Sequence, residues 1–363
     1  MLDGILVSQT LRDLVASAAI QALIPVRDDQ FQPSSLDLRL GADLWQLQCS
    51  FLPGETGVAR RLGELATASH RLDRDHPVVL HRGGVYLAEL EEVVELPDDV
   101  WGRGNPKSST GRLDVFVRLL CERGYAFDTV PAGYHGRLFL EITPQSFHVA
   151  VRRGDCLGQL RLGRGTPGLT ADDLRSRQAD HPLCFWSDRG PAPVDESPPS
   201  IILSVELDRP DRAPVGYLAR RHQPPIDLQG RRLPIDRYWT SLDPARDGQV
   251  LEPEQFYIFA TRERLRIPPD LCAELVPFDA TKGELRTHYA GFIDSGFGWT
   301  EDDPRTGAKL VLEIRTHDVP FLLEHGQPLF RIEFFRNEAH PDSLYGPGSS
   351  YQMQDLKLAK QFG

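Results

Sequence analysis

A short stretch from Lys107 to Arg112, "KSSTGR", gathers side chains that bind phosphate groups. Two cations and two serine hydroxyls fall within six positions, directly after the turn "GRGNP". Exposed backbone N–H groups, serine hydroxyls and cations together form a cradle for phosphate oxygens. A loop that enters a helix with a serine cap contains the same residue types. The stretch therefore predicts either a phosphate loop or a capped helix start.

A second stretch, "QPSSLDLRLG", combines a strand pattern with two charges. Leu36, Leu38 and Leu40 alternate with Asp37 and Arg39. This period of two is typical of a half-buried strand. The charged face meets either water or a partner inside the protein, and alternation alone leaves both possibilities open.

The elements that must position these residues occur twice in the chain. "VLHRGGVYLAELEEVVELPDDV" aligns with "VLEPEQFYIFATRERLRIPPDL", so that Tyr86 matches Tyr257, 171 positions later. Further on, Glu141 matches Glu313 at an offset of 172. A constant register over two long blocks predicts a duplicated domain.

Short alternating segments broken by Gly, Pro and Asp dominate both copies, whereas helical periodicity is confined to "QTLRDLVASAAIQALI" and "ADDLRSRQ". We therefore expect a mainly β protein of two tandem jelly-roll or β-sandwich domains with few short helices. The stretch 188–200 is rich in Pro and charge, as linkers are. The predicted domains are 1–187 and 201–363.

Composition limits the classes of partner. The net charge of −11, from 52 acidic and 41 basic residues, disfavours a nucleic acid polymer and leaves a small phosphorylated ligand open. No apolar run approaches the roughly 18 residues of a membrane helix, and the N-terminus lacks a secretion-signal pattern. Five single cysteines without a CxxC pair disfavour disulfides and structural zinc. A cytoplasmic protein without a membrane partner is expected.

Taken together, the two stretches and "GYHGRLFLEI" followed by "RRGDCLGQL" resemble the dCTP deaminases, a family that belongs with the trimeric dUTPases. The family pattern is Q-P-x-S-x-D-x-R-L-G, then R-S-S-x-x-R, then I-D-x-G-W/F-x-G leading into L-E. Lys107 replaces the usual first Arg, which keeps the charge and loses the planar fork. The resemblance implies dUTPase-like domains and hydrolytic deamination of dCTP to dUTP and ammonia. In this light Asp37 and Arg39 form an inward-facing ion pair that supports the subunit interface or the site.

The two halves retain different parts of the family pattern. The first half has the "KSSTGR" loop, but reads "TVPAGYHG" where the family has I-D. The second half has lost the Ser-Ser loop and keeps "YAGFIDSGFGW", followed by Glu313 in "LVLEI". One composite site of the first loop and the second segment is the economical hypothesis. A first-half site with Glu141 beside Ser108 and Arg112 is the alternative.

The resemblance also implies roles for single residues. Glu313, or Glu141, is the expected general base, while Ser108 and Arg112 hold the water and stabilise charge near the reacting carbon. The expected substrate-binding residues are Lys107, Ser109, Ala290, Ile293 and Asp294.

The C-terminal stretch "LYGPGSSYQMQ" resembles the family's mobile tail, which folds over the bound triphosphate. Tyr345, Tyr351 and Gln354 match its spacing, although Ser350 stands where a Lys is common. We expect a lid formed by these three side chains. An ordinary frayed tail is the alternative.

Deamination by zinc uses an H-x-E motif with P-C-x-x-C, which this sequence lacks. We therefore expect a carboxylate to move the protons without zinc. Magnesium is expected to enter with the triphosphate of dCTP. The resemblance adds dTTP as a possible inhibitor.

The sequence leaves further interpretations of function and assembly open. The fold also suits a dUTPase or a bifunctional dCTP deaminase and dUTP pyrophosphatase. An inactive nucleotide-binding regulatory protein is another alternative. The chain forms either a homo-oligomer, as a trimer of two-domain chains, or a pseudo-symmetric monomer.

Overall fold

The computed structural model of the chain consists mainly of strands with a few short helices, which confirms the expected fold class. The chain divides into two compact units. Unit 1 contains residues 1–166 and 222–231, and unit 2 contains 167–221 and 232–363. The structure describes residues 3–186, 190–277, 285–287, 291–303, 306–316, 318–346, 349 and 351–362.

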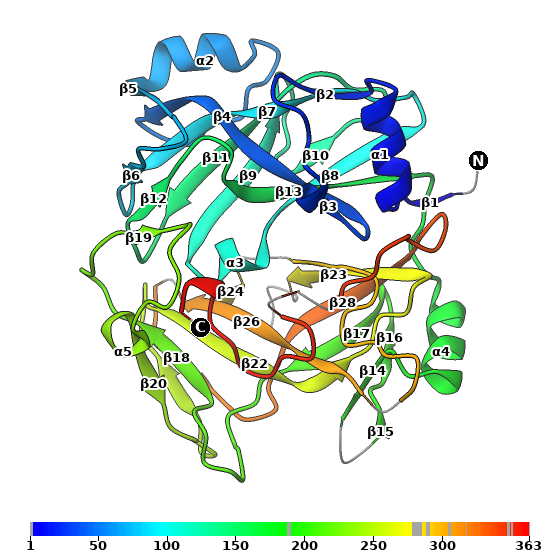
Figure 1. Cartoon of the computed structure of the whole chain (residues 1–363). Helices are drawn as coiled ribbons and strands as arrows, with labels where there is room; N and C mark the ends of the chain where they lie inside the picture. The colour runs from blue at the N-terminus through cyan, green and yellow to red at the C-terminus, as the bar shows by residue number, and fades with distance from the viewer. Residues whose placement is uncertain are drawn as a thin grey trace. The chain divides into compact units, whose positions relative to one another are not determined.

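In unit 1, the strands of the main sheet follow the order β10-β8-β13-β4-β7-β11-β9 (Figure 1). Their bounds are Thr129–Val130, Val100–Pro106, Cys156–Arg164, Ser35–Leu47, Val85–Glu95, His135–Pro144 and Val115–Cys121. The strands β1 Gly4–Ile5, β2 Ile20–Ala22, β3 Phe31–Gln32 and β5 Ala66–Arg71 extend it. A smaller sheet contains β6 Val78–Leu80, β12 Val149–Val151 and β19 Ile226–Asp227.

The long strand β4 joins two parts of this sheet. Its first half pairs with β13, and its second half pairs with β7 and β5 after a register shift between Leu40 and Leu44. A strand that changes partners in this way turns a corner between two packed layers. The predicted strand in "SSLDLRLG" therefore exists and lies at the centre of unit 1.

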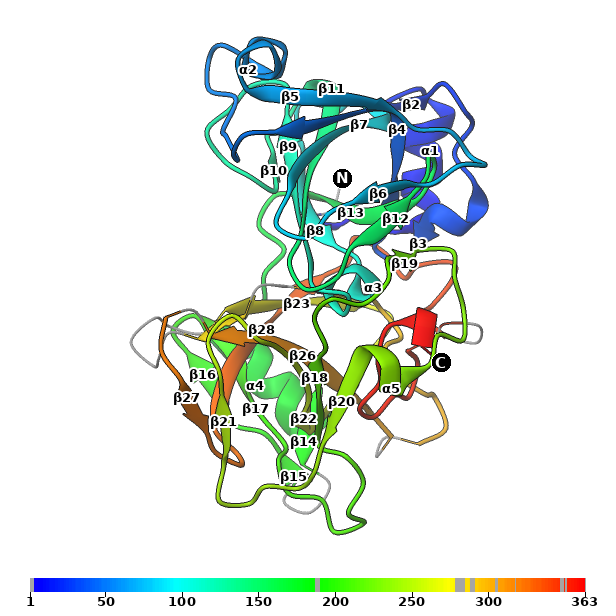
Figure 2. The ribbon, with the colours of Figure 1, turned by 90° about the vertical axis from the view of Figure 1, so that its left-hand side faces the viewer.

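Three α-helices accompany unit 1 in the described part of the chain: α1 Ser8–Ala16, α2 Val58–Leu65 and α3 Ser108–Gly111. The helix predicted in "QTLRDLVASAAIQALI" ends earlier than its apolar pattern does, because Ala18 adopts a left-handed φ of 61° and β2 follows. Figure 2 shows α2 beside β5, and α2 packs against both β4 and β5.

Unit 2 contains two larger sheets and one separate pair of strands. The first follows the order β15-β14-β22-β18-β20, with β26 on β22 and β24 on β26. The second follows β16-β17-β28-β23-β25, and β21 pairs with β27. The first sheet's bounds are Gly190–Pro191, Cys184–Trp186, Phe256–Leu265, Gly216–Ala219, Trp239–Leu242, Ala308–Thr316 and Leu285–Thr287. The bounds of the second sheet, in the same order, are Val194–Glu196, Pro199–Ser204, Pro328–Arg336, Leu271–Pro277 and Phe292–Ile293. The strand β21 is Gln249–Leu251, and β27 is Phe321–Leu323.

Two helices belong to unit 2: α4 Ala171–Asp180, which packs on β16 and β17, and α5 Ile235–Tyr238, which contacts β20. The short helix predicted in "ADDLRSRQ" is therefore confirmed. Its Thr170 caps α4 by accepting a hydrogen bond from the Asp173 N–H at 3.2 Å.

The strand pairs of the two units share a register. Glu141 on β11 lies opposite Leu87 on β7, and Glu313 on β26 lies opposite Ile258 on β22. These pairs differ by the same offsets as the sequence repeat. Gly154 and Gly326, which are also 172 positions apart, have the same backbone conformation, with left-handed φ values of 88° and 80°.

The boundary between the units differs from the predicted domain boundary. The units divide after Thr166, so α4 belongs to unit 2 rather than to a first domain that extends to residue 187. The stretch expected as a linker contains β15 and β16, which pair with β14 and β17. Proline is compatible with such edge strands, so a Pro-rich composition does not by itself exclude them.

None of the helices in the described ranges is long and apolar enough for a bilayer span.

Candidate functional site

The "KSSTGR" stretch forms one tight turn at the end of β8. The Lys107 N–H donates to the Leu157 carbonyl at 2.9 Å, and the Lys107 carbonyl accepts from Thr110 and Gly111 at 2.8 and 3.1 Å. Lys107 itself is the N-cap of α3 and makes no side-chain capping bond. The prediction of a helix start capped by serine is therefore wrong, because the N-cap residue is Lys107, which has no hydroxyl.

Around this turn, Ser108 is exposed, whereas Ser109 and Arg112 are buried. The turn thus presents one hydroxyl to the outside and holds a second hydroxyl and a guanidinium beneath it. Hydroxyl groups and cations gathered in one turn suit phosphate oxygens.

Asp37 holds the ammonium group of Lys107. The Lys107 Nζ forms an ion pair with the Asp37 carboxylate, and Asp37 is only 4% exposed. The Gln32 amide also reaches the Asp37 Oδ2, at 3.4 Å. The strand β4 therefore fixes the side chain of the first residue in the turn.

Arg39 points to the same side of β4 as Asp37 but has a different partner. Its Nε donates to the Glu92 Oε1 at 2.7 Å and its backbone N–H to the Glu92 Oε2 at 2.9 Å. Its terminal nitrogens donate to the carbonyls of Ile24 and Pro25 at 2.7 and 3.0 Å. The expected ion pair between Asp37 and Arg39 is therefore wrong. Residues two apart on a strand lie side by side, and their partners come from elsewhere: Lys107 in the turn after β8 pairs with Asp37, and Glu92 on β7 pairs with Arg39.

Glu141, one candidate base, is enclosed in unit 1. It lies on β11 between Leu87 and Arg118 of the adjacent strands and is 3% exposed. Burial raises its pKa above the ordinary value, against the opposing effects of the Ser50 hydroxyl, the Arg118 charge and the Phe51 N–H. Its Oε2 has no hydrogen-bond partner among the described residues. The group is therefore a buried carboxyl that loses its proton less readily than an exposed one.

The chain segment before α2 covers this face of β11. Phe139, on the same face as Glu141, packs in a cluster with Val58 of α2. Gly54, in the segment before α2, exchanges backbone hydrogen bonds with Gly124 at 2.8 and 3.2 Å, and these bonds hold the segment in place. Leu140 points to the opposite face, toward Gly158 beside the end of β8. Unit 1 by itself thus places Glu141 and the "KSSTGR" turn on opposite faces of β11.

Glu313, the other candidate base, lies on β26 in unit 2 and is buried. Ile293 ends β25 in the other sheet of the unit, opposite Ala273, and the buried Asp294 follows it. The Asp294 carbonyl accepts a hydrogen bond from the Phe297 N–H at 3.1 Å, which forms the turn of the "FIDSGFG" stretch. Ala290 lies outside the described residues.

The three predicted tail residues are docked on unit 2. Tyr345 donates its N–H to the Ser295 carbonyl at 2.8 Å, and Tyr351 is buried. Gln354 makes two hydrogen bonds with the backbone of Lys309, both at 3.0 Å. The described part of the tail is therefore ordered against β26 and the 295–298 turn, and the frayed alternative does not describe it.

Two residues that the sequence patterns did not indicate organise these regions. Gln352 bridges the tail and the turn, since its amide donates to the Gly296 carbonyl at 2.9 Å and accepts from the Gly298 N–H at 3.1 Å. Glu92 is the partner of Arg39, and its match with Glu263 in the sequence repeat was a signal that could have revealed it.

Glu263 occupies the corresponding place in unit 2. It accepts hydrogen bonds from the Ser204 N–H at 2.8 Å, the Ser204 hydroxyl at 2.6 Å and the Trp186 indole N–H at 2.9 Å. The aligned positions 92 and 263 therefore both hold a buried glutamate, whose partner is a cation in unit 1 and a set of neutral donors in unit 2.

Two sequence models match the chain. The N-terminal domain of 2'-deoxycytidine 5'-triphosphate deaminase matches residues 2–166, and the C-terminal domain of the same protein matches residues 170–362. The chain belongs to the dCTP deaminase family. Hydrolytic deaminases make up this family, which confirms the resemblance and the expected class of enzyme.

A solved structure and several curated proteins are similar to this family member. The crystal structure of 2'-deoxycytidine 5'-triphosphate deaminase from Agrobacterium tumefaciens aligns with 94% of this chain and 100% of its own, with a TM-score of 0.85 and 36% identity. A "dCTP deaminase, dUMP-forming" from Rhodococcus jostii is 32% identical over 192 residues, which are 50% of this chain and 92% of that protein. One of the same description from Methanosphaera stadtmanae is 33% identical over 116 residues, 32% of this chain and 56% of that protein.

Proposed function

We propose that this protein removes the amino group from C4 of the cytosine in dCTP, giving ammonia and a uracil deoxynucleotide. The observation that carries the proposal is the match of both halves to the two domains of dCTP deaminase. The phosphate-binding residue types in the "KSSTGR" turn and the buried carboxyls Glu141 and Glu313 support it.

The triphosphate would bind at the turn, through Lys107, Ser109 and the exposed N–H groups. Magnesium would arrive bound to the triphosphate, as part of the substrate. Ile293 and Asp294 would contact the nucleoside, with the backbone of Ala290 at the base. The tail residues Tyr345, Tyr351 and Gln354 would close over the phosphates.

The reaction needs a group that moves protons between water and the leaving amine. Glu313 would accept one proton as the water oxygen bonds to C4 and would give it to the ring nitrogen N3. It would then take the second proton from the hydroxyl on C4 and pass it to the amine as the C4–N bond breaks. Ser108 and Arg112 would hold the water and stabilise charge near C4. Glu141 is the alternative base, and its raised pKa suits proton return. Since the sequence lacks the zinc-deaminase motif, we propose that no zinc takes part.

A second candidate function adds release of pyrophosphate. Relatives such as the Rhodococcus jostii protein carry the description "dUMP-forming". The same site would then also direct water to the α-phosphorus of the uracil nucleotide. The product would be dUMP rather than dUTP.

The test is to incubate the purified full chain with dCTP and magnesium and to separate the nucleotide products while ammonia is measured. Ammonia with dUTP supports deamination alone, and ammonia with dUMP and pyrophosphate supports the second candidate. Cleavage of added dUTP with intact dCTP would replace the proposal by a dUTPase. No turnover of either nucleotide would leave an inactive nucleotide-binding protein.

The same assay tests the remaining expectations. A zinc chelator that leaves magnesium in place should not lower the rate. Added dTTP should lower it if dTTP is an inhibitor. Light scattering of the purified chain distinguishes a trimer from a monomer.

A further inference from the structure

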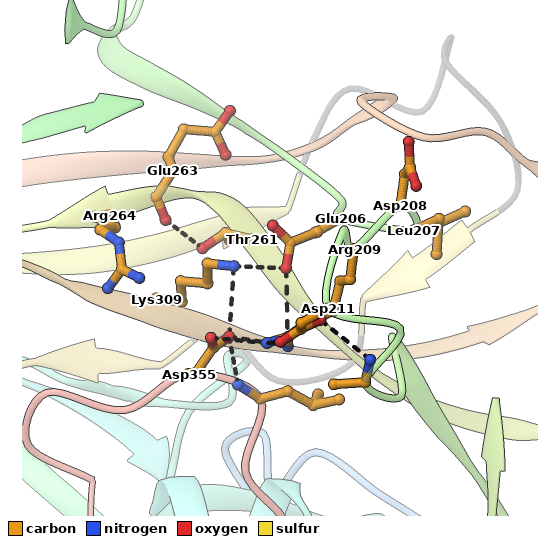
Figure 3. Close-up of polar contacts among 12 residues, drawn as sticks. Glu206, Leu207, Asp208, Arg209, Asp211, Thr261, Glu263, Arg264, Lys309 and Asp355 are labelled. Atoms are coloured by element: carbon orange, nitrogen blue, oxygen red, sulfur yellow. Dashed lines mark hydrogen bonds and ion pairs between the residues drawn. The ribbon is translucent and has the colours of Figure 1, made fainter. Parts of the chain in front are cut away.

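A cluster of charged side chains in unit 2 joins the C-terminal tail to the strand that carries Glu313. Figure 3 shows the amine of Lys309 on β26 between Glu206 and Asp355, with Arg209 reaching the same aspartate. Lys309 Nζ lies 2.5 Å from the Glu206 Oε2 and 3.4 Å from the Asp355 Oδ1. The tail thus supplies one of the two carboxylates around a buried ammonium.

Arg209 holds Asp355 with both terminal nitrogens. Its Nη1 and Nη2 donate to the two oxygens of Asp355 at 3.3 and 3.2 Å. A fork of this kind fixes the orientation as well as the position of the carboxylate. Burial opposes the charge of Asp355, yet Lys309 and Arg209 together lower its pKa below the ordinary value.

The tail supplies one of the two carboxylates that face the largely buried cations of the cluster. Lys309 and Arg209 carry two positive charges at largely buried positions, whereas Glu206 supplies one negative charge from the body of the unit. Asp355 supplies the second. Asp211 also contacts Arg209, but its side chain is 60% exposed and belongs to a surface turn. Withdrawal of Asp355 would leave Lys309 with Glu206 alone and Arg209 with Glu206 and the exposed Asp211, and this loss of a partner at largely buried cations is costly.

The anchor lies directly beside two proposed nucleotide contacts. Gln354, the residue before Asp355, donates from its side-chain amide to the Lys309 carbonyl, and its own carbonyl accepts from the Lys309 N–H. Tyr351 lies four positions before Asp355 in the same docked segment. Glu313 lies four positions after Lys309 on β26. One strand therefore carries both the candidate base and the attachment point of the tail.

We propose that Asp355 is a positioning residue that anchors the 351–355 segment to Lys309 and Arg209 and so sets Tyr351 and Gln354 for the nucleotide. This inference rests on the proposed function, in which those two side chains contact dCTP. Asp355 itself acts through them and does not touch the substrate.

The test compares three variants of the full chain. Asp355→Asn removes the charge, Asp355→Glu restores it, and Asp211→Asn removes the exposed carboxylate from the same arginine. Hydrogen exchange measured by mass spectrometry reports on the tail and on the Lys309 amide, whose acceptor is the Gln354 carbonyl. Steady-state kinetics with dCTP report whether Tyr351 and Gln354 are correctly placed for the nucleotide.

Asp355→Asn should speed exchange of both peptides by about tenfold and raise the KM for dCTP by a similar factor, with kcat within about twofold. Asp355→Glu should recover most of the KM, and Asp211→Asn should match the wild type. In the wild type, molar salt should speed exchange of the tail, because Asp355 is partly exposed and its ion pairs are screened.

Unchanged exchange in Asp355→Asn would overturn the anchor, and faster exchange with an unchanged KM would overturn the positioning role. Failure of the proposed function looks different, because the wild type itself would then release no ammonia from dCTP. The exchange measurements would still decide whether Asp355 docks the tail.

Discussion

Asp37 and Lys107 form an ion pair that links the central strand of unit 1 to the first residue of the "KSSTGR" turn. The two residues are 70 positions apart, and the aspartate is almost completely buried. A lysine side chain has four rotatable bonds, and ordering it costs entropy when a ligand binds. The carboxylate orders this side chain before any nucleotide arrives.

Asp37→Asn should weaken the binding of dCTP more than it slows the chemical step. The variant removes the charge that orients Lys107, so we expect the KM to rise about three- to tenfold with little change in kcat. Steady-state kinetics over a range of dCTP concentrations measure this. Asp43→Asn is the matched control, because Asp43 lies on the same strand in an exposed pair with Arg71. Equal KM values for both variants would contradict the orienting role.

The two candidate bases can be separated by substitution with glutamine. Glu313→Gln keeps the size of the side chain and removes the proton acceptor, so kcat should fall by about 100-fold or more. Glu141→Gln should leave kcat within about threefold, because its face of β11 is covered within unit 1. Both variants are assayed for ammonia from dCTP. The reverse result would assign the base to Glu141.

Glu141 should make the stability of the protein depend on pH. Its pKa is raised above 4.5 by burial, so the folded chain keeps a proton that the unfolded chain has released. The stabilisation is complete below the unfolded pKa and declines as pH rises through the folded pKa. The melting temperature of the wild type minus that of Glu141→Gln should therefore fall between pH 4 and pH 7. A constant difference across that range would show that the carboxyl has the same proton affinity in both states.

The buried pair of Arg39 and Glu92 should be important for folding. Glu92→Gln leaves a guanidinium without its charge partner at a side chain that is 1% exposed, which should cost about 3 to 5 kcal/mol of the free energy of unfolding. Urea denaturation monitored by tryptophan fluorescence measures the change. Asp43→Asn, which breaks the exposed pair with Arg71, should cost less than about 1 kcal/mol. Similar losses in the two variants would contradict the role assigned to burial.

Much of the fold could be predicted because periodicity and repetition are local signals. The alternation around Leu36 to Leu40 predicted β4, and the match of Glu141 with Glu313 predicted two equivalent strands. The domain boundary was harder, because Pro191 suggested a linker where the edge strand β15 forms.

The pairing of charged residues could not be predicted from the sequence. Alternation put Asp37 and Arg39 on one face of a strand, but their partners came from β7 and from the turn after β8. Lys309 and Asp355 meet because the tail returns to β26, which depends on the path of the whole chain. Contacts of this kind are set by the topology of the sheets and not by local residue types.

Arg39 in unit 1 and Ser204 in unit 2 lie beside the equivalent glutamates Glu92 and Glu263. This difference between the units has a consequence for how such a protein evolves. When identical subunits each fold from one domain, every substitution is repeated at all equivalent places at once. Here the two places are encoded separately in one gene product, so one of them can lose a buried cation while the other keeps it. Each unit is free to specialise without imposing the same change on its counterpart.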